Sequence, residues 1–525
     1  MKRMLSFTLS CVISVMTVQA QSKVFKEVSE EISLQMRVIT QDDALIGYLA
    51  FTQLEKANAD SFNYKISIMD ENLNDIGSVN FREENLNLQA VSFEQDMLCL
   101  AYIKSNVIGN NYASTKAFKK ALDKAKHAVV TQFISLQGKI LQTNNYNVDI
   151  TTSETYGYNG ATYNAHFAVG KLKRPVVLKN IPQKGFTCFY GDENDNNLLA
   201  FNPLGKQVWK KTLPKADGFS LLTSNNNIYI LSKKKEKMLE GGFEVTGYNS
   251  EDGKQFSNYI LKDKKGNSLK VLDFENDPAT GKPVVSGNII NSKYGNNFMT
   301  PKHITKGTYD GVFTILLNGP KKSDIKETFS YWGDGSQSPN ISTRAKFSEN
   351  ESFPRFSETV RDNNGNTYFV GSSLIKKTKW GAIASSVVLA PLIVVSPFIL
   401  AMGGTQKYKI KDAMLVKQNA NGGLTLEKVI PGDDARFYPN RMPLNEMDTK
   451  SYYSVFNSNT KTNFLIVDDV KNIVIYNINS KKIERTVSHT DGQVRTNIYP
   501  AKEGYIMVSE YNKKEKYTRL SIEAL

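Results

Sequence analysis

The sequence predicts an all-β fold built from many short antiparallel strands, and two observations support this prediction. One unit recurs along the chain: an apolar run, then a polar turn with Gly, Pro or Asn, then a run of alternating polarity. Such alternation with such a turn is typical of a β-hairpin. In addition, a further short apolar run precedes each copy, so each repeat supplies three or four strands. The 40% hydrophobic and 22% charged content is that of a folded chain.

The clearest copy of the hairpin spans Leu198–Leu213. Its apolar run is Leu198–Phe201, its turn is Asn202–Gly205, and its alternating run begins at Gln207. Six further copies begin at Tyr64, Val129, Phe243, Val312, Ala413 and Ile473. Another first strand, Tyr517–Ile522, has no second strand after it. The sequence therefore predicts a repeat architecture in which one strand must come from elsewhere in the chain.

With three or four strands in about 50–70 residues, the chain resembles the β-propeller superfamily, in which small sheets surround an axis. The resemblance implies a single propeller over residues 21–525, with seven or eight blades and eight favoured. The N-terminal segment Val24–Ser33 is expected to pair with Tyr517–Ile522 and to close the ring. The Trp-Asp signature of WD repeats and the Gly-Gly pattern of kelch repeats are absent. A β-sandwich or a pair of barrels is the alternative fold.

Residues 1–20 have the pattern of a secretory signal peptide. Lys2 and Arg3 precede the apolar stretch Leu5–Val18, and small residues at Val18 and Ala20 predict cleavage before Gln21. We therefore expect an exported protein that is periplasmic, envelope-associated or secreted. A lipoprotein signal at Cys11 is the alternative, although the apolar run before it is short.

Charge and cysteine content restrict the partners and the redox chemistry. Cleavage would remove two basic residues and no acidic one, which lowers the net charge from +14 to +12. A basic exported protein meets anionic lipid or acidic polysaccharide, so nucleic acid is not an expected partner. Cys99 and Cys188 lie in apolar runs of different repeats. We expect both to be small buried side chains, with a disulfide as the alternative.

Residues 106–126 interrupt the second repeat with a short basic amphipathic helix, expected near residues 114–126. Its apolar positions follow helical spacing, and Ser114 or Thr115 can cap its start. The other positions carry Lys116, Lys119, Lys120 and Lys124. This helix either packs over a blade edge with its lysines in water or attaches the protein to an anionic membrane or a partner.

Residues 376–409 form a second insert, centred on the uncharged segment Gly381–Gly403. Its 23 residues could span a membrane as one helix. However, Pro391 and Pro397 break helical hydrogen bonding, and a crossing would separate strands of one ring. We therefore favour an apolar hairpin that leaves the propeller and returns to it, dipping into a membrane or binding a partner. A segment folded back on the propeller and a true single span remain alternatives.

Both inserts follow the second strand of a repeat, and all such connections leave a propeller on one face. The sequence therefore predicts one basic face with an apolar protrusion, a combination that suits an anionic membrane. The predicted docking residues are Trp380, Val387, Val388, Leu389, Leu392, Ile393, Val394, Val395, Phe398, Ile399 and Leu400, with Lys376, Lys377, Lys379, Lys407, Lys409, Lys116, Lys119, Lys120 and Lys124.

No catalytic, cofactor-binding or metal-binding motif is present in the sequence. The four histidines have no metal-ligand spacing, and Asp192–Asn197 lacks the glycine and the final glutamate of a calcium loop. The turn Asp362–Asn366 is better explained as a turn before a strand. We therefore expect a non-catalytic binding or assembly platform at the cell envelope, whose partner is an anionic membrane surface or an envelope protein.

Two alternatives stay open. One is a hydrolase or lyase that acts on polysaccharide or peptide with carboxylates at the propeller axis. The other is a membrane protein with a single span through residues 381–403. Carboxylates together with His or Arg at the axis would favour the enzyme, whereas apolar and amide side chains there would favour the platform.

Overall fold

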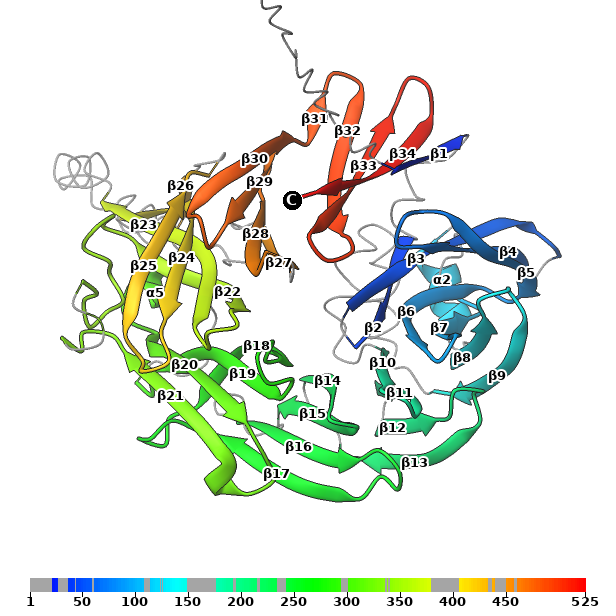
Figure 1. Ribbon diagram of the computed structural model, residues 1–525, viewed down its shortest axis with the longest axis horizontal. Coiled ribbons are helices and arrows are strands. Elements are labelled where there is room, and N and C mark those ends of the chain that lie inside the picture. The colour runs from blue at the N-terminus through cyan, green and yellow to red at the C-terminus, as the bar shows by residue number, and fades with distance from the viewer. Residues whose placement is uncertain are drawn as a thin grey trace, which may run out of the picture.

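Eight antiparallel sheets surround a central axis in the computed structural model, so the chain folds as an eight-bladed β-propeller (Figure 1). The model describes residues 21–26, 36–42, 44–58, 61–107, 114–122, 124, 126–148, 176–191, 195–214, 218–233, 242–293, 301–335, 338, 340–378, 406–432, 437–439, 450–457 and 460–525. The seven predicted hairpins are the third and fourth strands of blades 1 to 7.

The first four blades follow one another along the chain. Blade 1 contains β2 (Met36–Gln41), β3 (Ala44–Lys56), β4 (Phe62–Asp70) and β5 (Asp75–Glu83). Blade 2 contains β6 (Leu86–Glu94), β7 (Met97–Ser105), β8 (His127–Ser135) and β9 (Ile140–Asn147), with helix α2 (Thr115–Leu122) after β7. Blade 3 contains β10 (Val177–Ile181), β11 (Gly185–Gly191), β12 (Asn196–Phe201) and β13 (Gln207–Leu213). Blade 4 contains β14 (Gly218–Ser224), β15 (Asn227–Lys233), β16 (Phe243–Asn249) and β17 (Gln255–Leu261).

The last four blades continue the order. Blade 5 contains β18 (Leu269–Asn276), β19 (Pro283–Ile290), β20 (Tyr309–Leu317) and β21 (Ile325–Tyr331), with helix α5 (Pro301–Ile304) and the 3-10 turn η1 (Lys322–Asp324). Blade 6 contains β22 (Phe353–Arg361), β23 (Thr367–Thr378), β24 (Gln406–Gln418), β25 (Leu424–Ile430) and the short β26 (Phe437–Pro439). Blade 7 contains β27 (Ser451–Asn457), β28 (Thr462–Asp468), β29 (Asn472–Asn477) and β30 (Lys482–Ser488). Blade 8 contains β32 (Val494–Pro500), β33 (Tyr505–Asn512), β34 (Tyr517–Ala524) and β1 (Gln21–Lys26), with β31 (Thr490–Asp491) beside β32.

The hydrophobic core lies between the blades. Eight clusters of buried side chains among the described residues fill the eight interfaces between neighbouring blades. Second strands are covered on both faces, and every residue of β7 except Lys104 is buried. In the outermost strand β5, exposed positions instead alternate with half-buried or buried ones from Ile76 to Glu83. This difference explains why the sequence shows an apolar run before each hairpin and alternation in its last strand.

The N-terminal strand closes the ring, as predicted. Strand β1 pairs antiparallel with β34, with Gln21 opposite Ile522 and Lys26 opposite Tyr517. The strand therefore begins three residues before the predicted Val24–Ser33, and residues 27–35 lie outside the described part. Tyr48 and Met69 of blade 1 pack with side chains of blade 8, so the first and last blades share one core.

The hairpin Leu198–Leu213 shows which local interactions specify a turn. The Asn202 side chain accepts a hydrogen bond from the Lys206 amide at 2.9 Å. Gly205 has a φ of 87°, which favours glycine, and a Cβ there would lie 2.5 Å from a ring carbon of Phe133 in blade 2. The same turn therefore closes one blade and packs against its neighbour.

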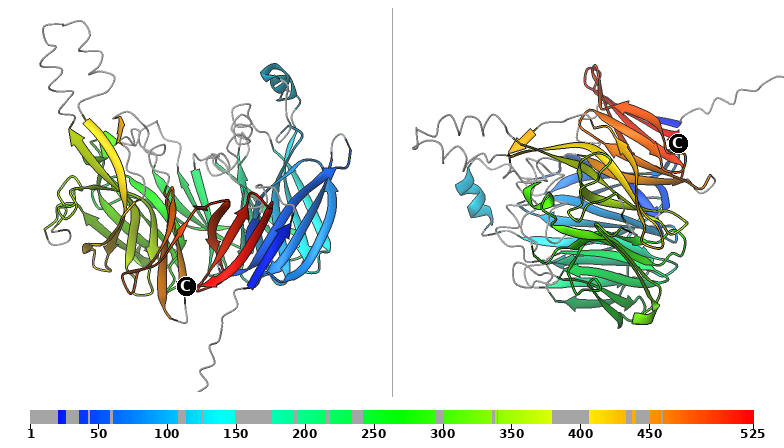
Figure 2. Two further views of the ribbon diagram at one scale, coloured as in Figure 1. Left: turned by 90° about the horizontal axis from the view of Figure 1, so that it is seen from above. Right: turned by 90° about the vertical axis from the view of Figure 1, so that its left-hand side faces the viewer.

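The two faces of the ring differ in their connections. First-to-second and third-to-fourth strand turns emerge on one face, which we call the turn face. The other connections emerge on the opposite face, which we call the insertion face. Helix α2 and the tip of the β23–β24 hairpin both project from the insertion face (Figure 2). The described parts of both inserts therefore lie on the same face.

Helix α2 is shorter than the predicted 114–126 range, and Ser114 Oγ accepts a hydrogen bond from the Ala117 amide at 3.2 Å, as a cap does.

Cys99 and Cys188 are buried and unbonded to each other, as expected. Burial raises the pKa of the Cys188 thiol to about 12.

Candidate functional site

The β23–β24 hairpin brings the two ends of the second insert together. Thr378 and Gln406 are register partners, as are Lys377 and Lys407. The 27 residues between Thr378 and Gln406 therefore leave and return at one point of blade 6. A single membrane crossing in this segment would carry the following strand away from its partner, so the pairing argues against the single-span alternative.

Lysines crowd the tip of this hairpin. Lys377 lies directly opposite Lys407, and Lys409 follows two residues later on the same face of the sheet. Lys376, Lys377 and Lys407 are exposed, whereas Lys409 is half-buried. Three exposed lysines are therefore gathered where the two strands of this hairpin end.

The other face of the hairpin provides a rigid base. Tyr408, Leu374 and Ile410 are buried there against Ile304 of α5 and Phe353 of β22. The short strand β26 also pairs with β24 at residues 407–409. The lysines are therefore held at a fixed place on the insertion face.

Helix α2 places a second group of lysines on the same face. Lys116, Lys120 and Lys124 are exposed, while nothing is described of the Lys119 side chain. Figure 2 shows the helix and the hairpin tip at separate positions around the ring. The structure thus brings the two lysine groups to one face without bringing them into contact.

The apolar part of the predicted site lies outside the described residues. This applies to Trp380, Lys379 and the apolar positions between Val387 and Leu400. Within the described part of the chain, no helix combines the length and the apolarity that a membrane crossing needs.

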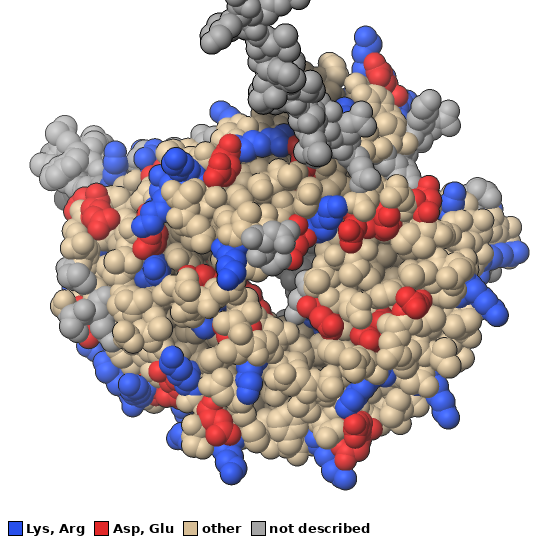
Figure 3. Space-filling model, in the orientation of Figure 1, with Lys and Arg blue, Asp and Glu red and all other residues tan. Residues whose placement is uncertain are grey.

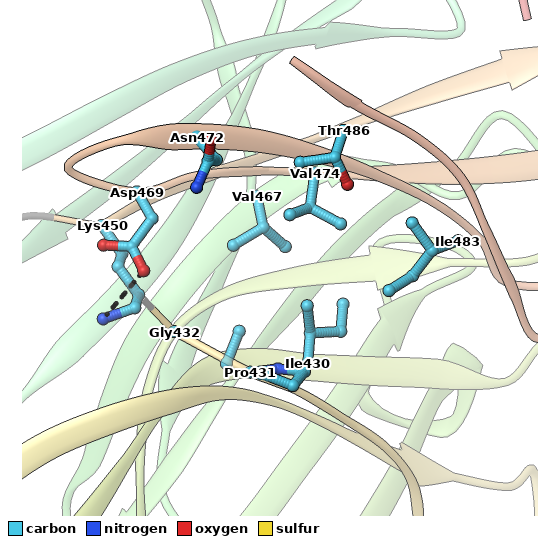
Figure 4. Close-up of a pocket in the computed structure, with 11 residues that line it drawn as sticks. Ile430, Pro431, Gly432, Lys450, Val467, Asp469, Asn472, Val474, Ile483 and Thr486 are labelled. Atoms are coloured by element: carbon cyan, nitrogen blue, oxygen red, sulfur yellow. Dashed lines mark ion pairs between the residues drawn. The ribbon is translucent and has the colours of Figure 1, made fainter. Parts of the chain in front are cut away.

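A small pocket lies near the insertion face between blades 6 and 7 (Figure 4). It encloses about 210 Å³, and its apolar wall includes Ile430, Val467 and Val474. Lys450 Nζ lies 3.5 Å from Asp469 Oδ2 at one end, and both side chains are about 5% exposed. The charge of this pair is internally balanced, so the pocket suits a small apolar group more than an ion.

The turn face has a different character. In Figure 3, Lys and Arg side chains are interspersed with Asp and Glu side chains around a central opening. Neither sign of charge dominates this face in that view, in contrast to the lysines at the hairpin tip.

The axis carries a pair of carboxylates on the innermost strands of blades 5 and 6. Asp273 of β18 accepts a long hydrogen bond from Thr359 Oγ1 of β22 at 3.4 Å, and Glu358 precedes Thr359. Burial raises the pKa of Asp273. The pKa of Glu358 is raised to about 7, mainly by burial and to a smaller extent by the negative charge of Asp273. A carboxyl group with a pKa near 7, such as that of Glu358, suits a general acid or base at neutral pH.

Basic groups lie on the same two strands, nearer the insertion face. Lys270 Nζ donates to Tyr309 Oη at 3.1 Å. Burial, with a smaller effect from Arg355, lowers the pKa of Lys270 to about 8. Within the described residues, no three His, Cys, Asp or Glu side chains come close enough to hold a metal ion.

Sequence reasoning missed this axial cluster. Asp273 and Glu358 are 85 positions apart, and each lies in an ordinary strand. The signal that could have found them is position: each charged residue stands in the first strand of its repeat, which faces the axis of any propeller.

Solved structures similar to this chain are propellers as well. The match with the Dos1 propeller has 7% sequence identity and a TM-score of 0.41, and it spans 95% of this chain and 94% of the Dos1 chain. The match with the WD40 domain of SCAP from fission yeast has 10% identity and a TM-score of 0.37, and it spans 93% of this chain and 98% of the SCAP chain. The match with the β-propeller domain of the Trilobed protease from Pyrococcus furiosus has 7% identity and a TM-score of 0.36, and it spans 84% of this chain and 95% of the protease chain. No protein-family model and no curated protein sequence matches the chain.

Proposed function

We propose that this propeller is an exported, non-catalytic platform that docks on an anionic membrane surface of the cell envelope through its insertion face. The observation that carries the proposal is the opposed pair Lys377 and Lys407 at the tip of a rigid hairpin, next to the ends of an uncharged segment. Charge attraction and apolar burial add when both face the same lipid surface.

The expected strength follows from the number of exposed lysines. A lysine near an anionic membrane contributes about 1 kcal/mol at moderate ionic strength, and the attraction decays within a Debye length. Loss of Lys376, Lys377 and Lys407 therefore removes about 3 kcal/mol, or roughly 100-fold in affinity. In about 1 M salt the remaining electrostatic attraction should vanish.

Flotation with vesicles of phosphatidylglycerol and phosphatidylcholine tests the proposal. The first variant replaces residues 379–405 by Asn-Gly, because Thr378 and Gln406 are partners that a two-residue turn can join. The second changes Lys376, Lys377 and Lys407 to Glu. Both should float less than the wild type.

The matched control changes three exposed lysines of the turn face, Lys139, Lys206 and Lys461, to Glu. It has the same net charge as the second variant but should float like the wild type. Equal loss in both charge variants would refute a specific docking face. Undiminished flotation of the loop-replacement variant would refute a role for the apolar segment.

Export is a separate part of the proposal and rests on residues 1–20 alone. Expression in a host with a secretory pathway should yield a chain that begins at Gln21, which intact mass spectrometry measures. An uncleaved chain in the cytoplasm would refute it.

A second candidate function, cleavage of polysaccharide or peptide at the axis, is favoured by the Asp273–Glu358 pair. Release of reducing ends from acidic polysaccharides, measured for the wild type and for Glu358→Gln, tests it. An enzyme of this kind would lose activity in the variant and would show a pH profile with an inflection near 7.

A further inference from the structure

The turn face holds a polar hollow between blades 5 and 6 that the docking proposal does not use. It encloses about 270 Å³. Three turns surround it: the one after β18, the one between β22 and β23, and the one after β24. None of these turns touches the insertion face, so the hollow stays open when the opposite face rests on a membrane.

A buried charge pair forms one wall of the hollow. Arg361 Nε donates to Asp277 Oδ1 at 2.7 Å, and the two side chains are 7% and 2% exposed. Arg361 Nη1 donates to Thr367 Oγ1 at 2.9 Å. Thr280 Oγ1 donates to the other carboxylate oxygen of Asp277 at 2.7 Å. Asp277 is the only acidic residue among the described residues of the wall, and both of its carboxylate oxygens are engaged within the protein.

A hydrogen-bonded network forms the floor. Thr314 Oγ1 donates to Gln418 Oε1 at 2.7 Å and lies 3.0 Å from Thr367 Oγ1. Gln418 Nε2 in turn donates to Ser330 Oγ at 2.6 Å. These side chains come from β20, β21, β23 and β24, so they hold the two blades in a fixed relation and preorganise the hollow.

The charge balance of the wall is positive. Lys326 also lines the hollow, is exposed, and makes no ion pair with any described residue. With Asp277 neutralised by Arg361, one lysine charge is left for a ligand. The remaining lining groups include the amides of Asn363 and Asn364 and the Nδ2 group of Asn419, whose Oδ1 already accepts from two backbone amides of its own turn. Amides both donate and accept, which matches hydroxyl groups.

We infer that this hollow binds one small hydroxylated anion of the sugar-acid class, with its carboxylate at Lys326 and its hydroxyls at the asparagine amides. The volume of the hollow suits one such molecule, because it equals the volume of about nine waters and lies below the volumes of pockets that hold drug-sized ligands. Among the residues that the structure describes, no aromatic side chain lines the hollow. Hydrogen bonds and charge, not stacking, must therefore supply the specificity.

Titration calorimetry with D-glucuronate, D-glucose and inorganic phosphate tests the inference on the full chain without vesicles. The wild type should bind glucuronate, and glucose should bind at least about 10-fold more weakly because it lacks the carboxylate. Lys326→Gln should weaken glucuronate about 10-fold and leave glucose unchanged. Lys322→Gln, a nearby exposed lysine outside the hollow, is the matched control and should bind as the wild type does.

A second variant, Asn364→Ala, keeps the test independent of charge. It should weaken glucuronate and glucose alike, because it removes a contact to hydroxyls. Three results would overturn the inference: no glucuronate binding by the wild type at 10 mM, equal glucuronate affinity for the wild type and Lys326→Gln, or phosphate binding as tight as that of glucuronate. None of these outcomes bears on membrane docking, which vesicle flotation measures separately.

Discussion

The carboxylate Glu358 should make the propeller less stable as pH rises, and Glu358→Gln should abolish that dependence. The pKa of Glu358 rises from 4.5 to about 7 on folding, because the side chain is buried near Asp273. Between these two values the folded state holds a proton that the unfolded state has released. Stability therefore falls as pH rises across this window, and the full cost is present above pH 7.

The magnitude follows from that difference. The rise in pKa corresponds to about 3 kcal/mol at pH 8, and partial solvent exposure reduces this to about 2 kcal/mol. For a chain of about 500 residues the entropy of unfolding is about 1 kcal/mol per kelvin, so the expected shift in Tm is about 2 °C. Glutamine cannot ionise and should not incur this cost.

Thermal unfolding at pH 5 and pH 8, followed by intrinsic fluorescence, measures the effect. Glu358→Gln should melt about 2 °C above the wild type at pH 8 and within about 0.5 °C of it at pH 5. Glu515→Gln, at an exposed glutamate of the β33–β34 turn, is the control and should match the wild type at both values. A difference between Glu358→Gln and the wild type that is the same at both pH values would refute the reasoning.

Three other predictions follow from the same structure. Arg361→Met should lower the free energy of unfolding by about 3–5 kcal/mol, because it leaves the Asp277 carboxylate buried and unpaired. In urea unfolding, adding Asp277→Leu to this variant should restore most of the loss. Equal loss in the single and the double variant would contradict the ion pair. Ser22→Cys with Ser521→Cys should form a disulfide that seals the ring and raises Tm, since the two are register partners; a persistent free-thiol signal would contradict the closure. The two native buried thiols should stay unreactive to a thiol reagent until the protein unfolds, and rapid labelling of the folded protein would contradict their burial.

Local patterns were enough to predict the ring, because a blade is built from contiguous strands. The alternation in Leu198–Leu213 and the apolar run Phe186–Tyr190 before it reflect one strand half exposed and another covered on both faces. The closing strand was predicted less accurately, since Gln21–Lys26 is short and its partner lies at the other end of the chain.

The polar sites could not be predicted in the same way. Asp277 and Arg361 meet because two blades pack side by side, and nothing near either residue in the sequence indicates its partner. Thr314 and Gln418 are buried where the pattern suggests only a strand and a turn. Periodicity identifies which face of a strand is buried, but the pairing of polar groups across an interface depends on the angle between blades.

The central claim is that the insertion face, and not the turn face, meets an anionic membrane. The most direct measurement places an environment-sensitive fluorophore on the chain beginning at Gln21, at Lys376→Cys or at Lys206→Cys. Each variant loses one exposed lysine, and the two native cysteines are buried. Phosphatidylglycerol vesicles should shift the emission to shorter wavelength for the label at 376 and leave the label at 206 unchanged. An equal shift at both positions, or a shift at 206 alone, would contradict the claim.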